Sequence, residues 1–249
     1  MNQMDAVRTE WSRPPLEDTG NVSTERPWAL DPTDLRAKVK AAERERYHGW
    51  RNRDGLWQKY FHTGVEGLTV IDYGCGWGLE TLALTRLGAH VTFADVVPSN
   101  VGATAAVLSA HDYTAASLHG YFLSCSVPPA TLGPFDIFYA NGVIHHVPEA
   151  RKVMEWAAAR CRQARLMLYN ERSWLSAAGA PLPVLSQADP RYLKFLRHMD
   201  AVGHYTEWYD YDKLATLLDG LFDIQEWTPI GDGNYSAAIL GSKCYDQPL

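Results

Sequence analysis

The residues with the clearest chemical meaning lie in the segment V-I-D-Y-G-C-G-W-G-L-E-T at residues 70–81. Gly74, Gly76 and Gly78 allow tight backbone turns and let a ligand approach the main chain closely. Asp72, at the expected end of a strand, would repel a phosphate and attract an ammonium or sulfonium group. The spacing differs from the dinucleotide fingerprint G-x-G-x-x-G because the third glycine comes one residue early. The plainer alternative is an ordinary glycine-rich turn from strand to helix.

Two later segments also place ionisable side chains after predicted strands. Asp95 ends the run V-T-F-A-D, where its plainer alternative role is to cap the next helix. His145 and His146 lie in F-D-I-F-Y-A-N-G-V-I-H-H-V-P-E at residues 135–149. An imidazole takes up a proton near neutral pH, so either histidine is a candidate general base. Ligands of α/β sheets bind at the carboxyl ends of the strands, where we expect these residues to meet.

The composition restricts the class of protein. Of the 249 residues, 46% are apolar and 21% are charged, which is typical of one globular domain. Lysine and arginine number 23 against 29 acidic residues, and the net charge of −6 argues against a surface that coats nucleic acid. The sequence contains neither an apolar run of the roughly 20 residues that cross a bilayer nor a signal peptide. We therefore expect a cytoplasmic protein that does not enter a membrane.

The four cysteines, Cys75, Cys125, Cys161 and Cys244, are scattered along the chain without C-x-x-C spacing. They are typical of reduced thiols in a cytoplasmic protein, and a nucleophilic cysteine is the less favoured alternative. Their spacing predicts no metal site.

The order of the predicted elements favours an α/β fold. From residue 68, short apolar runs alternate with helical patterns, as in consecutive βαβ units. The predicted strands are 69–72, 90–94, 120–124, 135–140 and 164–169, and the predicted helices are 79–87, 99–111 and 148–162. After a helix at 212–221, strands 222–229 and 235–242 are joined by a short turn and must form an antiparallel hairpin. We predict a three-layer, Rossmann-like sheet of seven strands, mostly parallel, with an antiparallel final strand.

The remaining segments define the domain organisation. Residues 1–32, rich in proline and polar side chains, are expected to form a flexible arm before a single domain at 33–249. This domain comprises N-terminal helices at 33–66, with helical patterns at 34–47 and 54–61, and a core at 67–172. An insert at 173–209 interrupts the alternation, and a helix and hairpin follow at 210–249.

The glycine segment resembles motif I of the class I S-adenosyl-L-methionine (SAM)-dependent methyltransferases, V-L-D-x-G-C-G-x-G. Residues 135–149 resemble the family's block F-D-x-I-x-x-x-x-V-L-H-H-V-P, and the resemblance covers about residues 70–242. It implies SAM as the methyl donor and S-adenosyl-L-homocysteine (SAH) as the product. It also implies that Asp95 binds the ribose hydroxyls, for which two carboxylate oxygens are suited.

The resemblance assigns the site residues with one departure. The family's Asp for the adenine amino group is replaced by L-S-C-S-V-P-P, which leaves Ser124, Cys125, Ser126 or a backbone carbonyl for this role. His145 and His146 are the candidate catalytic residues, and the alternative is a structural pair in which one imidazole caps the next helix. The implied cofactor-binding residues are Asp72, Gly74, Cys75, Gly76, Trp77, Gly78, Asp95, Val96, Ser126 and Asn141.

The insert at 173–209 is expected to cover the acceptor. Its basic residues, Arg197 and Lys194 foremost, would meet a carboxylate or phosphate, or else lie in water on the outside of a lid helix. Aromatic side chains near its end would form a wall for a flat or sugar-like acceptor. The acceptor-binding candidates are Tyr139, Tyr169, Asn170, Arg197, His204, Tyr205 and Trp208. Earlier in the chain, Arg44, Tyr47 and Trp50 would close over the cofactor or merely cover the sheet edge.

Two signatures found among relatives are missing. Catechol-type relatives place acidic metal ligands where this chain has Ala140-Asn141 and Asn170-Glu171, so we expect no metal. The Asn/Asp-Pro-Pro-Tyr/Phe signature of nucleobase-amine methyltransferases is replaced by A-N-G-V at 140–143, which argues against nucleic acid substrates.

These patterns predict a methyltransferase that acts on an O or N atom of a small-molecule acceptor, such as a natural product, a sugar-like compound or an anion. The protein would be a monomer or homodimer. The alternatives are a protein or RNA methyltransferase, a catalytically silent partner protein that binds SAM and, least favoured, a nicotinamide-dependent oxidoreductase.

Overall fold

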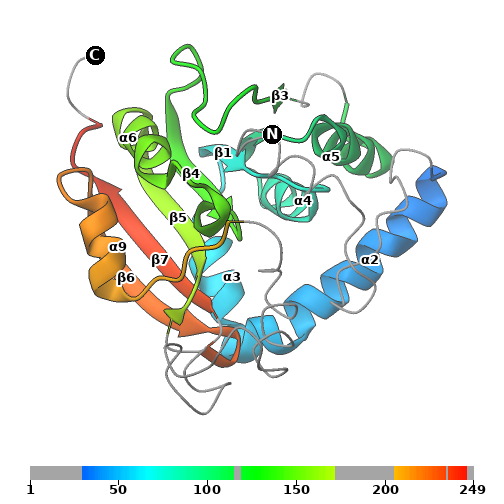
Figure 1. The fold of residues 1–249 in the computed structure, drawn as a ribbon. Coiled ribbons are helices and arrows are strands. Elements are labelled where there is room, and N and C mark those ends of the chain that lie inside the picture. The colour runs from blue at the N-terminus through cyan, green and yellow to red at the C-terminus, as the bar shows by residue number, and fades with distance from the viewer. Residues whose placement is uncertain (1–29, 115–118, 172–204, 234, 246–249) are drawn as a thin grey trace.

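The computed structural model describes residues 30–114, 119–171, 205–233 and 235–245, and these are built around one mixed sheet (Figure 1). The strands are β1 (Thr69–Tyr73), β2 (His90–Asp95), β3 (His119–Phe122), β4 (Phe135–Asn141), β5 (Cys161–Tyr169), β6 (Phe222–Ile230) and β7 (Tyr235–Ser242). Their order is β3-β2-β1-β4-β5-β7-β6. Neighbours from β3 to β5 run parallel, whereas β7 is antiparallel to both β5 and β6. The predicted seven-stranded sheet with an antiparallel final strand is confirmed.

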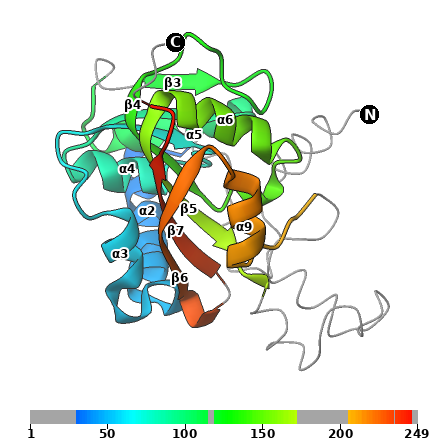
Figure 2. The same ribbon diagram turned by 90° about the vertical axis from the view of Figure 1, so that its left-hand side faces the viewer.

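Helices cover both faces of this sheet and complete the three layers (Figure 2). One face carries α2 (Pro32–His48), α3 (Leu56–Phe61), α4 (Leu79–Arg86) and α5 (Pro98–Ala110), and the other carries α6 (Ala150–Arg160) and α9 (Tyr211–Leu218). Short 3₁₀ turns are η3 (Trp50–Gly55), η5 (Ile144–His146) and η7 (Gly231–Gly233). Successive strand residues serve opposite faces, so that Val70 packs toward α3 while Ile71 packs in the cluster with α6.

Local signals in the sequence determine where two of the helices begin. The Asp31 side chain accepts hydrogen bonds from the backbone N–H groups of Thr33 (2.8 Å) and Asp34 (3.1 Å), before the first turn of α2. Asp210 accepts from the N–H of Lys213 (2.8 Å) at the start of α9. Both are N-caps, which satisfy backbone donors that have no partner within the helix.

Several predicted boundaries shift by one to three residues, and the boundary between α6 and β5 has a clear physical reason. The helix predicted at 148–162 is shorter, because α6 ends at Arg160 and Cys161 has an extended backbone with φ −128° and ψ 138°. Cys161 pairs with Phe135 of β4, so β5 begins three residues before the predicted 164. A buried cysteine at this position fits the hydrophobic periodicity of a helix as well as that of a strand, and the main-chain pairing with β4 makes it part of the strand.

Parts of two predicted segments, the N-terminal arm and the insert, are not among the described residues. Residues 1–29 of the predicted arm and residues 173–204 of the insert lie outside them.

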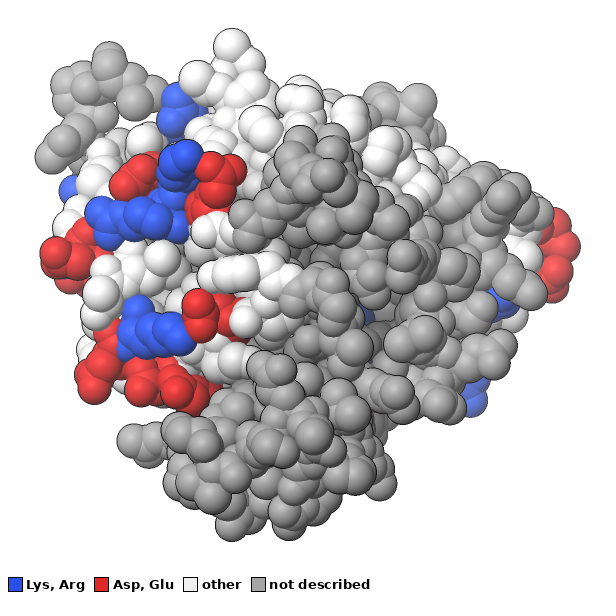
Figure 3. All heavy atoms as spheres, in the orientation of Figure 1, with Lys and Arg blue, Asp and Glu red and all other residues white. Residues whose placement is uncertain are grey.

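On the face shown in Figure 3, side chains of both signs lie together over α6 and α9, as in the ion pair between Arg151 and Glu155 (3.0 Å). In the part of the chain that the structure describes, no helix has the length and apolar character needed to span a membrane.

We expect Gly78→Ala to destabilise the fold far more than Gly67→Ala. Both glycines have left-handed backbones, with φ +93° and +73°, and an L residue there costs ~1–2 kcal/mol. A Cβ on Gly78 would also lie 2.9 Å from Cα of Thr104 in α5, whereas no atom lies within 4 Å of one on Gly67. Overpacking adds ~1–3 kcal/mol, so we expect a loss of ~2–5 kcal/mol for Gly78→Ala. Urea unfolding measures both losses, and equal values would contradict the packing argument.

Candidate functional site

β1 and β2 bring the glycine loop and two carboxylates to the carboxyl edge of the sheet. Asp72 lies near the end of β1, and Asp95 is the last residue of β2. The loop between β1 and α4 is fastened to β2, because the N–H groups of Gly74 and Cys75 both donate to the carbonyl oxygen of Ala94 (2.7 and 3.2 Å). The predicted glycine segment therefore forms a strand-to-helix turn at the edge where α/β sheets hold their ligands.

The three glycines of this loop have different surroundings. All have a positive φ, but a Cβ on Gly74 would collide with the side chain of Val143, and one on Gly78 would meet Thr104. Gly76, with φ +55°, has no heavy atom of the described residues within 4 Å of the place where a Cβ would stand. Gly74 and Gly78 thus let the loop pack against the protein, while Gly76 leaves room for a ligand against the main chain.

Asp95 holds the loop while keeping capacity for a ligand. Its carboxylate accepts hydrogen bonds from the N–H groups of Gly76 (3.0 Å) and Val97 (2.8 Å) and from the amide of Asn100 (3.2 Å). Burial raises the pKa of Asp95 to about 6, although these hydrogen bonds act in the opposite direction. A carboxylate has about four lone-pair positions, so one further donor can be accepted.

Asp72 is buried more deeply than Asp95, with only 2% of its surface exposed. Among the described residues, its carboxylate accepts one hydrogen bond, from the hydroxyl of Thr81 (2.5 Å). Burial raises the pKa of Asp72 to about 7 against the lowering effect of Thr81, and the charges of Glu80 and Asp95 add to the rise. A cationic ligand group beside these carboxylates would stabilise their ionised forms.

Glu80, in the first turn of α4, carries a buried charge that the protein itself compensates. Its Oε1 accepts from the guanidinium of Arg46 (3.1 Å) and the hydroxyl of Tyr47 (3.0 Å), and its Oε2 accepts from the hydroxyl of Tyr139 (2.6 Å). Nε2 of His62 lies 3.0 Å from Oε2. Burial alone would raise the pKa of Glu80, but the bond and charge of His62, the charge of Arg46 and the Tyr139 bond lower it to about 2. Glu80 is therefore ionised at physiological pH.

The two predicted catalytic histidines lie in η5, where residues 205–207 contact them. The ring of His145 is fully buried and stacks on Tyr169, with ring centroids 3.7 Å apart. Nδ1 of His146 lies 3.2 Å from the carbonyl oxygen of Tyr205 and 3.2 Å from the hydroxyl of Thr206. Because a carbonyl can only accept, Nδ1 of the neutral ring carries the proton and Nε2 of His146 is the basic nitrogen.

The acceptor candidates lie at several places, and Tyr205 contacts His146 through its backbone carbonyl. Tyr169 and Trp208 pack together, with ring centroids 5.2 Å apart, beside the two histidines. Tyr139 is fully buried and bonds to Glu80. Arg197, Lys194 and His204 lie outside the described residues.

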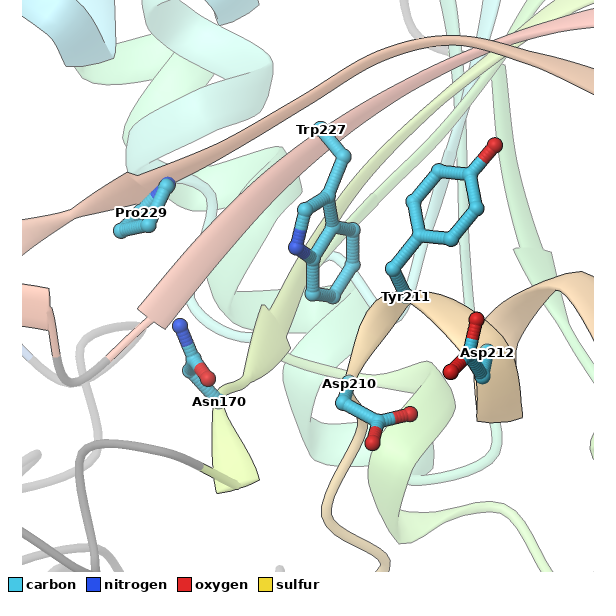
Figure 4. A pocket seen from close by; sticks show the side chains of 6 residues that line it. All are labelled: Asn170, Asp210, Tyr211, Asp212, Trp227 and Pro229. Atoms are coloured by element: carbon cyan, nitrogen blue, oxygen red, sulfur yellow. The ribbon is translucent and has the colours of Figure 1, made fainter.

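Asn170, at the end of β5, lines a separate pocket of about 280 Å³ (Figure 4). Figure 4 shows the indole of Trp227 between Asn170 and the ring of Tyr211. The other lining residues are Asp210, Asp212 and Pro229. Sequence reasoning missed this pocket because its walls come from β5, β6 and the start of α9, and the helix cap at Asp210 was the only local signal.

The other cofactor candidates line the same edge. Ser126 is buried, and its carbonyl oxygen accepts from the hydroxyl of Tyr73 (2.7 Å). Val96 and Trp77 are partly buried against the core. All four cysteines are free, and burial raises the pKa of the Cys75 thiol well above its usual range, which argues against a nucleophilic thiolate there.

Sequence reasoning also missed Glu80, Arg46, His62 and Asn100. An acid in the first turn of a helix indicates only a helix start, and no spacing pattern connects Glu80 with its partners. Within the described ranges, no group of three His, Cys, Asp or Glu side chains is placed to hold a metal ion.

The strand order, the glycine loop and the acids at the ends of β1 and β2 define the Rossmann-like fold of class I methyltransferases. A model of the family described as "methyltransferase domain" matches residues 41–221, and the chain belongs to this family.

Individual relatives differ in how much they share with this chain. A ubiquinone biosynthesis O-methyltransferase of Caulobacter sp. (strain K31) is 28% identical over 181 residues, which cover 60% of this chain and 66% of that protein. Matches to several proteins of this name span 40% to 66% of their lengths. A ribosomal protein L11 methyltransferase of Dechloromonas aromatica is 39% identical over 77 residues, covering 30% of this chain and 24% of that protein.

The fold is also found in a solved structure. Magnesium protoporphyrin IX methyltransferase from Synechocystis PCC 6803, with bound SAM, has a TM-score of 0.52 and 19% identity, over 96% of each chain. At this identity the likeness establishes the fold.

We expect the free energy of unfolding to fall as the pH rises from about 4 to about 7. The pKa values of Asp72 and Asp95 rise from 3.8 to about 7 and about 6 on folding, so the folded chain holds more protons in this window. Their contribution is complete below pH ~4 and is lost through pH 6–7. Glu80, whose pKa is lowered from 4.5 to about 2, loses its contribution as the pH falls from about 4.5 to about 2, so it affects only the lower end of this window.

Urea unfolding at pH 5, 6, 7 and 8 measures this dependence. Asp72→Asn is expected to flatten it, leaving the smaller share of Asp95. The control is Asp112→Asn, which changes an acid whose side chain is 84% exposed. If the free energy of unfolding changed equally with pH in wild type and in Asp72→Asn, the assignment of this pH dependence to Asp72 would be contradicted.

Proposed function

We propose that this chain is a SAM-dependent methyltransferase that methylates an oxygen or nitrogen atom of a small-molecule acceptor. The observation that carries the proposal is the glycine loop fastened to β2 at the carboxyl edge of the sheet, where the buried carboxylates of Asp72 and Asp95 lie at the ends of β1 and β2 and no described atom lies within 4 Å of a Cβ placed on Gly76. Membership of the methyltransferase domain family supports it. SAM, when bound, supplies a methyl group on a positively charged sulfur, which makes the methyl carbon open to attack by a nucleophile.

The residues present fit such a donor. Its ammonium and sulfonium groups are cationic, and a cation beside Asp72 and Asp95 would offset the burial that raises the pKa values of both carboxylates. Asp95 retains capacity for a ribose hydroxyl, and Gly76 gives the ligand access to the main chain. Val96 and the backbone near Ser126 are the proposed surroundings of the adenine.

An aromatic O–H acceptor is the substrate class that we favour. The partly buried indole of Trp208, which packs against the buried ring of Tyr169, offers an aromatic surface beside the two histidines. Nε2 of His146 is the proposed proton acceptor, with Nδ1 held by Tyr205. The name of the ubiquinone biosynthesis relatives supports an O-methylation, and residues 173–209 are the proposed cover of the acceptor.

A protein acceptor is the second candidate. The match to the ribosomal protein L11 methyltransferase favours it. We rank it lower because this match covers less of both proteins than the match to the Caulobacter O-methyltransferase.

Binding of SAH tests the donor site. We expect wild type to bind SAH, and Asp95→Asn to weaken binding about ten- to hundredfold, as for loss of a hydrogen bond to a charged group. Asp112→Asn, at an exposed acid, should bind SAH like wild type. Calorimetric titration measures the three affinities. A wild type that binds NADH and not SAH would disprove the proposed function.

Replacement of His146 tests the proton acceptor. Incubation with SAM and a panel of phenols, catechols and amines identifies a substrate by mass spectrometry. With that substrate, His146→Ala should lower kcat ~10²–10⁴-fold and leave SAH affinity nearly unchanged. His145→Ala should chiefly reduce thermal stability, because its ring stacks on Tyr169. An unchanged kcat in His146→Ala would contradict its role as proton acceptor and leave His145 and His146 with a structural role.

A further inference from the structure

A line of hydrogen bonds runs from the buried charge of Glu80 to the carboxyl end of β4. The hydroxyl of Tyr139 donates to Oε2 of Glu80 (2.6 Å), and Nδ2 of Asn141 donates to the oxygen of Tyr139 (3.1 Å). Tyr139 is fully buried, whereas Asn141 is partly exposed as the last residue of the strand. The two side chains lie on the same face of β4 because they are two residues apart.

The charge on Glu80 determines the direction of every bond in this line. Arg46, Tyr47 and His62 surround the carboxylate, which is ionised and can only accept. Tyr139 therefore donates its single hydroxyl proton to Glu80, and its oxygen is left to accept. Only the NH₂ end of the Asn141 amide can satisfy that oxygen. The amide oxygen of Asn141 is consequently turned away from Tyr139.

We propose that Glu80 is a positioning residue that acts through Tyr139 to hold the amide oxygen of Asn141 toward the site of methyl transfer, where it accepts a hydrogen bond from the O–H or N–H group of the bound acceptor; when an O–H group is methylated, its single proton then passes from this bond to Nε2 of His146. This inference rests on the proposed function. It goes further by naming the group that orients the nucleophile, and by favouring hydroxyl and amine acceptors over thiols, which are weak donors, and over carbon nucleophiles.

The sheet register places Asn141 at a suitable position. Tyr139 pairs with Asp72 of β1, and Asn141 pairs with Met167 of β5, so Asn141 lies two residues beyond the level of Asp72. The glycine loop follows β1 at this edge, and η5 with the two histidines begins three residues after Asn141. A nucleophile bonded to the amide oxygen would be held at this edge of the sheet, and holding the reacting atoms in place is a large part of the acceleration of such a reaction.

The test uses two ligands that differ next to the transferred methyl group. SAH has no substituent on its sulfur, whereas sinefungin carries an amino group where SAM carries its methyl group. That amino group donates hydrogen bonds and therefore detects an acceptor atom close to the place of the nucleophile. Calorimetry gives Kd for both ligands, and the ratio of sinefungin Kd to SAH Kd is the readout that a general loss of structure would not change.

We expect Tyr139→Phe to raise this ratio about three- to tenfold, since the Asn141 amide loses the partner that orients it. Tyr73→Phe is the matched control. Tyr73 is also a buried tyrosine, on the neighbouring strand β1, and its hydroxyl donates to the carbonyl oxygen of Ser126 (2.7 Å), outside this line. Tyr139→Phe loses the bonds to Glu80 and Asn141 and Tyr73→Phe loses the bond to Ser126, but Tyr73→Phe should leave the ratio unchanged.

Two further variants keep the test decisive if Tyr139→Phe folds poorly. Asn141→Ala removes the amide at the strand end and should raise the ratio as much as Tyr139→Phe. Glu80→Gln should raise it too, because a neutral amide no longer forces Tyr139 to donate. An unchanged ratio in Asn141→Ala, or an equal rise in Tyr73→Phe, would overturn the proposal. Failure of wild type to bind SAH would instead contradict the proposed function itself.

Discussion

The ionised carboxylate of Glu80 is the interaction on which the rest of the site depends. It sits directly after the glycine loop and joins the end of α2, through Arg46 and Tyr47, to His62 after α3 and to Tyr139 of β4. A buried charge is tolerated only while its donors surround it, so these segments are energetically coupled. The N-terminal helices are thereby part of the site, although they precede the sheet in sequence.

The negative charges of the three buried acids around the loop, Glu80, Asp72 and Asp95, are compensated to different extents. Glu80 is compensated by the protein, and its pKa is lowered to about 2. Asp72 and Asp95 are compensated far less, and burial raises their pKa values to about 7 and about 6. The fold thus places two carboxylates that gain from a cation next to one that needs none, and the N–H group of Gly76 donates to one of them, Asp95. Such an arrangement directs a cationic ligand to one location.

The parts of this protein that could be predicted from sequence are those determined by nearby residues. The glycine loop, the hairpin of β6 and β7 and most strands follow from local patterns, and the comparisons agree with the family that these patterns resemble. The predicted boundary at Cys161 was wrong because a buried residue there fits helix periodicity and strand periodicity equally well. The surroundings of Glu80 were missed because Arg46 and His62 lie 34 and 18 residues away, and only the packing of α2 and α3 brings them to α4. The pocket beside Trp227 likewise exists only once β6 and α9 have met.

The place of β7 in the sheet has a consequence for how the protein is made. β5 gains its second neighbour only when residues 235–241 pair with 163–169, so one edge of this buried strand has no partner while the ribosome translates the residues between them. An unpaired apolar strand edge is a template for pairing with other chains. The nascent chain therefore exposes such an edge in that interval, and slower translation between β5 and β7 would prolong the exposure.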